Sequence, residues 1–110
     1  LDSFDQVIDA FHTTGNTANL AATLAYLAVF LDRTGRLGQA AILHGAATRH
    51  PAALSLVSDL TSVEEHLRDA LGDDTWGSRT NEGAAMEAGD AVEYAHAEIR
   101  RMRDELSASS

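Results

Sequence analysis

The chain of 110 residues has no cysteine, no lysine and one proline, Pro51. Without cysteine it can form no disulfide framework, no thiolate metal site and no thiol nucleophile, so we expect a reducing compartment, the cytoplasm. No apolar run approaches the roughly 20 residues that span a bilayer, and no basic flank precedes an apolar stretch at the N-terminus. The sequence therefore predicts a soluble cytoplasmic protein without a membrane partner.

Basic side chains are scarce, since 8 of them stand against 17 acidic ones and give a formal net charge of −9. A chain of this charge is repelled by phosphate at long range, so we expect no direct binding of nucleic acid by this segment. The one basic cluster, Arg100, Arg101 and Arg103, falls in the last part of a predicted helix. Cations are favourable there because of the helix dipole.

Helix-forming residues fill most of the chain, and β-branched runs are few. Hydrophobic residues make up 45% of the sequence, which is enough for a core. We predict an all-α single domain over residues 1–110, built of antiparallel αα-hairpins with about five to six helices. The first residue, Leu1, is not methionine, so we expect a fragment of a larger multidomain protein. The longer predicted helices run from about Ser3 to Thr13, Thr17 to Arg33, Leu37 to Thr48, Leu60 to Leu71 and Glu87 to Leu106.

Capping residues predict two further details. Thr61 and Ser62, each three residues before a glutamate, form capping boxes in two overlapping registers. Asp73 or Asp74 caps a short helix that holds Trp76 and stops at residues 81–83. Between residues 49 and 58 a linker or a short turn of helix is expected, because a proline there prevents a regular helix from continuing.

Two of the predicted helices differ in how their apolar residues are arranged, which indicates a surface position for the last helix and a position between neighbours for the helix over residues 17–33. The last one carries an apolar stripe opposite a charged side, as the cap of a helical stack would. Its charged side consists of Glu93, Glu98, Arg100, Arg101, Arg103 and Asp104. The helix over residues 17–33 is apolar nearly all round. We expect homodimerisation or aggregation through Phe4, Val7, Phe11 and the stripe of leucines from Leu20 to Leu31.

The segment from Leu24 to Pro51 resembles a tetratricopeptide unit, in which two helices flank a glycine turn. Its matching positions are Leu27, Gly35, Ala40 and Ala47. It departs from the pattern at Leu24, Ala28, Leu31 and His44, and its proline falls one residue early.

A longer stretch, over about residues 15–105, is similar to the C-terminal helical region of actinobacterial LuxR-type transcriptional regulators and of ATPase-linked adenylate cyclase relatives. The resemblance is carried by Gly15 to Leu24, Leu27-Ala28, Thr34 to Arg36, Ala40-Ala41, Leu43 to Ala47, Leu67, Leu71-Gly72, Trp76, Glu82-Gly83 and the tail from Ala91. It implies upstream helical repeats or an ATPase module of the same protein as the partner, with a DNA-binding element beyond this segment.

Two candidate surfaces follow from this reading. If the hairpin stacks as repeats do, the inner face of its first helix lines a groove for a partner or ligand. That face consists of Ala22, Ala25, Tyr26, Val29, Asp32 and Arg33. A second interface or pocket is predicted at His44, Trp76 and Met86, since Trp and Met are enriched at interfaces and the repeat pattern has an aromatic residue at position 44.

The sequence predicts no catalytic, metal or cofactor site. The five histidines lack the spacing of metal ligands, the carboxylate pairs stand at predicted helix starts, and no nucleophile motif is present. We therefore expect a non-enzymatic regulatory or interaction segment of a transcriptional regulator or signalling ATPase. The alternative is a helical sensor of a small-molecule effector, with Tyr26, His44 and Trp76 as pocket walls.

Overall fold

The computed structural model describes residues 2–50 and 60–109, and within them the chain forms six α-helices and no strand. This confirms the all-α prediction. None of the helices in these two ranges has both the length and the apolar character that crossing a membrane requires. The helices are α1 (Asp2–Thr13), α2 (Thr17–Arg33), α3 (Leu37–Ala47), α5 (Leu60–Leu71), α6 (Asp73–Ala84) and α7 (Ala88–Ser109).

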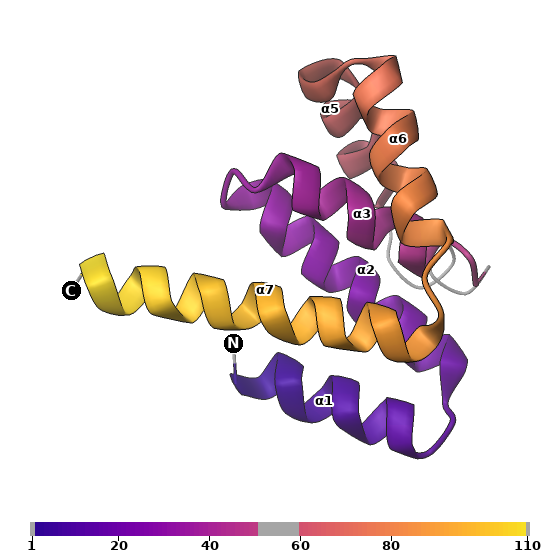
Figure 1. Ribbon diagram of the computed structural model, residues 1–110, viewed down its shortest axis with the longest axis vertical. Helices are drawn as coiled ribbons and strands as arrows, with labels where there is room; N and C mark the ends of the chain where they lie inside the picture. Colours follow the sequence, from indigo (N-terminus) through magenta and orange to yellow (C-terminus); the bar gives the residue numbers. More distant parts are fainter. Residues whose placement is uncertain (1, 51–59, 110) are drawn as a thin grey trace.

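Helix α3 lies at the centre of the molecule, with α2 on one side and α6 on the other (Figure 1). Helices α2 and α3 form the predicted hairpin, and Gly35 in their turn has a φ of 83°, a conformation that favours glycine. Helix α1 packs on α2, and the long helix α7 runs beside α1 and also touches α3. Helix α1 therefore contacts both α2 and α7.

Helix α6 is longer than predicted, because it continues through Asn81 and Gly83 to Ala84. The reason is tertiary packing: a β-carbon built on Gly83 would lie 1.8 Å from the carbonyl oxygen of Ile42 in α3. Glycine weakens an isolated helix, but in α6 its missing side chain allows the backbones of α6 and α3 to touch. The predicted aspartate cap is also wrong, since Gly72 is the N-cap and both aspartates lie in the first turn.

The capping boxes predicted for α5 are likewise wrong. The helix already includes Leu60, so Thr61 and Ser62 lie inside it and cannot act as residues before its first turn. Leu60, Val63 and Leu67 are buried as the apolar spacing predicts. The linker expected between residues 49 and 58 lies, from Pro51 onward, outside the described residues.

The surface available for the predicted dimer is narrower than the sequence suggests. The leucines of α2, at positions 20, 24, 27 and 31, are buried within the domain. Neighbouring helices of the same chain cover them, because α2 packs against α1, α3 and α5. Of the apolar residues named for this surface, Val7 stays exposed, while Phe4 and Phe11 are partly buried against the core.

Candidate functional site

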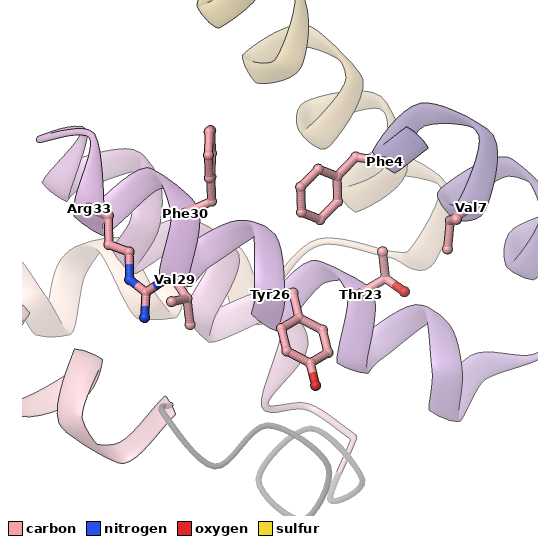
Figure 2. Close-up of a pocket in the computed structure, with 7 residues that line it drawn as sticks. All are labelled: Phe4, Val7, Thr23, Tyr26, Val29, Phe30 and Arg33. Atoms are coloured by element: carbon pink, nitrogen blue, oxygen red, sulfur yellow. The ribbon is translucent and has the colours of Figure 1, made fainter. Parts of the chain in front are cut away.

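An open apolar groove runs between α1 and α2, with a volume of about 460 Å³. Its walls come from the first half of α1 and from residues 23–33 of α2 (Figure 2). The lining residues are Phe4, Val7, Thr23, Tyr26, Val29, Phe30 and Arg33.

Helical spacing explains how these side chains come together. On α2, Thr23, Tyr26 and Phe30 are three and four residues apart, so they project from one face of the helix. On α1, Phe4 and Val7 are three residues apart and line the same groove. The rings of Phe4 and Phe30 pack with their centroids 6.3 Å apart at an angle of 49°, and this contact joins the two helices.

The groove contains both large hydrophobic side chains that are exposed in the described part of the chain. Tyr26 is 53% exposed and Val7 is 38% exposed. The other large apolar side chains in residues 2–50 and 60–105 are buried or partly buried. Exposed apolar surface of the described residues is thus concentrated at one place, where a binding partner would gain most by covering it.

Three of the six residues predicted for the groove line it: Tyr26, Val29 and Arg33. Ala22 and Ala25 are buried in the core instead. Because α2 is apolar on nearly every side, its sequence does not distinguish the face that packs inward from the face left open. Asp32 lies beside the groove, in a smaller pocket next to α5, and its carboxylate is 2.6 Å from Nδ1 of His66.

The second predicted set, His44, Trp76 and Met86, does not form one site. The rings of His44 and Trp76 meet edge to face inside the core, with centroids 4.9 Å apart. Met86 lines a different pocket beside Arg49, and the Arg49 guanidinium donates a hydrogen bond to the Met86 carbonyl. Burial lowers the pKa of His44, against a smaller opposite effect of Glu64, so this imidazole is neutral near pH 7.

Sequence reasoning missed a polar contact that holds α1 against α7. His96 of α7 lies between two carboxylates of α1, with Nδ1 2.5 Å from Asp5 and Nε2 2.8 Å from Asp9. Arg103, two turns further along α7, also donates to Asp5. The signal was the spacing of the two aspartates, which places them four residues apart on one side of α1. The two nitrogens of the imidazole face different carboxylates, which is a hydrogen-bonding geometry. Among the described residues, no group of three or more histidine, aspartate or glutamate side chains is placed so that it could hold a metal ion.

The contact of His96 with Asp5 and Asp9 is expected to stabilise the fold by an amount that depends on pH. Partial burial lowers the pKa of His96, but the hydrogen bonds and charges of Asp5 and Asp9 outweigh it, so the pKa is raised above 6.5. The stabilisation is present below about pH 6.5 and is lost as the pH rises through the folded value. We expect His96→Gln to cost roughly 1 kcal/mol at about pH 5.5 and much less at about pH 8.5. Urea unfolding of both proteins across this range measures the difference.

His12→Gln is the matched control, because His12 is an exposed histidine on α1 that makes no part of this contact. This variant should unfold at nearly the same urea concentration as the natural chain, because it removes none of the hydrogen bonds of His96. A His96→Gln loss that is equal at both pH values, or larger at high pH, contradicts the assignment.

Comparison with known proteins gives no match, since no family model, curated protein or solved structure is similar to this chain.

Proposed function

We propose that this chain is a non-enzymatic interaction module whose groove between α1 and α2 binds the apolar face of a partner helix. One observation carries the proposal: the exposed large hydrophobic side chains of the described residues, Val7 and Tyr26, both line that groove. Covering them removes apolar surface from water, which is the main driving force of such association.

A helix is the occupant that fits this shape best. The groove lies between two neighbouring helices and is lined by stripes at helical spacing, and ridges of a third helix pack into such a groove. Stacked helical repeats bury their open faces in the same way, by the next helix of the array. We therefore propose a neighbouring repeat of the same protein as the natural partner, and a regulatory role in a LuxR-type or ATPase-linked protein as the biological context.

The alternative, a sensor of a small effector, has less support at its predicted place. Tyr26 lies in the outer groove, whereas His44 and Trp76 contact each other in the core. These three side chains do not converge on one cavity, and a small-molecule site needs polar groups that do.

The groove predicts weak self-association of the isolated chain, since a second copy can cover it when the partner helix is missing. Light scattering at increasing protein concentration should show a rise in average mass. Replacing both exposed groove residues, Val7→Gln and Tyr26→Gln, should keep the protein monomeric to at least about ten-fold higher concentration, because each buried aliphatic or aromatic side chain contributes roughly 1.5–3 kcal/mol.

Ala70→Gln serves as the control, because Ala70 is exposed on α5, away from the groove. This variant should associate as the natural chain does. A natural chain that stays strictly monomeric at high concentration, or a control that loses association equally, contradicts the prediction.

A further inference from the structure

A second cavity, independent of the groove, lies where α3, α6 and α7 meet, and its volume is about 290 Å³. Unlike the groove, it is lined mainly by polar and charged side chains. They are Gln39, Arg79, Glu82, Tyr94, Glu98 and Arg101, together with Gly38 and Ile42.

Glu98 is the unusual residue of this cavity, because its side chain is only 1% exposed. The sequence placed it on the charged outer side of the last helix, and the structure corrects this. Its Oε1 accepts a hydrogen bond of 2.9 Å from Arg101, whereas its Oε2 has no hydrogen-bond partner. A buried carboxylate oxygen without a donor is costly, and in native proteins such an atom meets a bound group or an ordered water.

The groups around Glu98 define what kind of molecule can supply that donor. Two guanidinium groups and two carboxylates line the cavity, so its formal charge is balanced. Arg79 is paired with Glu82 only loosely, at 3.6 Å and near solvent, and Arg101 uses one of its five N–H donors on Glu98. Both guanidinium groups therefore keep donors for an anionic group.

Tyr94 adds a neutral polar group in the middle of this arrangement. Burial raises the pKa of its phenol, and the negative charges of Glu98 and Glu82 raise it further, so the hydroxyl keeps its proton. No hydrogen bond of this hydroxyl occurs within residues 2–50 and 60–109. It can donate to, or accept from, a molecule in the cavity.

We propose that this cavity binds a small zwitterion of the amino-acid type, whose carboxylate meets Arg79 and Arg101 and whose ammonium group donates to the Glu98 carboxylate after a rotation of that side chain brings the buried Oε2 to the cavity. A simple cation would face two guanidinium groups, and a simple anion would face two carboxylates, so neither matches the cavity as well. The volume of about 290 Å³ lies just below the usual range for ligand pockets, which favours a molecule of a few heavy atoms.

The test is an NMR titration of the whole chain, labelled with nitrogen-15, using three probes that differ by one charge. L-Alanine carries both charges, N-acetyl-L-alanine lacks the ammonium, and L-alanine methyl ester lacks the carboxylate. L-Alanine should give saturable shifts at the amides of α7 around Tyr94 and Glu98 in the millimolar range. Each single-charge probe should bind at least about ten-fold more weakly, because it loses one charged hydrogen-bonding group.

Variants connect binding to the cavity. Glu98→Gln keeps the shape and removes the charge, so it should weaken L-alanine at least about ten-fold. Tyr94→Phe removes one hydroxyl and should weaken the binding of L-alanine by a smaller factor. If Glu98→Gln does not fold, the Tyr94→Phe variant tests whether L-alanine binds in this cavity. Glu93→Gln, at an exposed position of the same helix outside the cavity, should bind normally.

The proposal is overturned if L-alanine gives no saturable shift, which would mean a cavity filled by water alone. It is also overturned if N-acetyl-L-alanine binds as tightly as L-alanine, or if Glu98→Gln leaves binding unchanged. The groove between α1 and α2 shares no lining residue with this cavity, so each proposal can fail without the other.

Discussion

Replacing Gly83 with alanine is expected to destabilise the protein by about 3 kcal/mol or more. The new β-carbon would lie 1.8 Å from the carbonyl oxygen of Ile42, so α6 would have to move away from α3. Gly45→Ala should have a similar effect, since its β-carbon would lie 2.1 Å from the carbonyl oxygen of Thr80. In both cases the obstructing atom belongs to a backbone, and the clash cannot be relieved by a change of rotamer.

Gly77→Ala is the matched control within the same helix. No atom lies within 4 Å of a β-carbon built at Gly77, so alanine should stabilise α6 by about 0.5–1 kcal/mol through its higher helix propensity. Urea unfolding followed by far-ultraviolet circular dichroism measures all three variants. If Gly83→Ala behaves like Gly77→Ala, the close approach of α3 and α6 is wrong.

Truncating Trp76 to alanine is expected to cost about 3–5 kcal/mol. The indole is 7% exposed and packs edge to face against His44, with the guanidinium of Arg68 6.0 Å from its ring centre. Alanine would leave a cavity between α3 and α6, and the neutral imidazole of His44 would lose its aromatic neighbour.

Tyr26→Ala provides the comparison, because it removes another large aromatic side chain from a position that is 53% exposed. Its loss of stability should stay below about 1 kcal/mol. Thermal unfolding followed by circular dichroism measures both variants, because this signal does not depend on the fluorescence of the tryptophan that one of them lacks. Equal losses at the two positions would show that Trp76 is not a core residue.

Helix boundaries could be predicted from the sequence where apolar spacing and turn residues agree. The helix from Thr17 to Arg33 was predicted with both ends correct, because Asn16 and Gly35 punctuate a strongly periodic segment. The length of α6 could not be predicted, because Gly83 stabilises the helix through close packing against α3, and α3 is remote in sequence. Local propensity favours a stop there, and tertiary packing overrides it.

The functional surfaces were harder to predict for a related reason. Helical periodicity reveals the buried face of a helix only when the opposite face is polar. Helix α2 is apolar on nearly every side, so the predicted groove contained both buried and exposed residues. Glu98 was misplaced because its charge suggested solvent. Its spacing from Ala91 and Ala95, seven and three residues, places it on their buried face, and this was the available signal.

The central claim, that the groove between α1 and α2 holds a partner helix, is tested most directly by hydroxyl-radical footprinting. Because the proposed partner is a neighbouring repeat of the same protein, the experiment compares the isolated chain with the product of the full reading frame, which is sequenced first. In the whole protein Tyr26 and Val7 should become protected from oxidation, whereas Tyr94, which is half-buried and outside the groove, should react equally in both. Equal oxidation of Tyr26 in the isolated chain and in the whole protein would contradict the account.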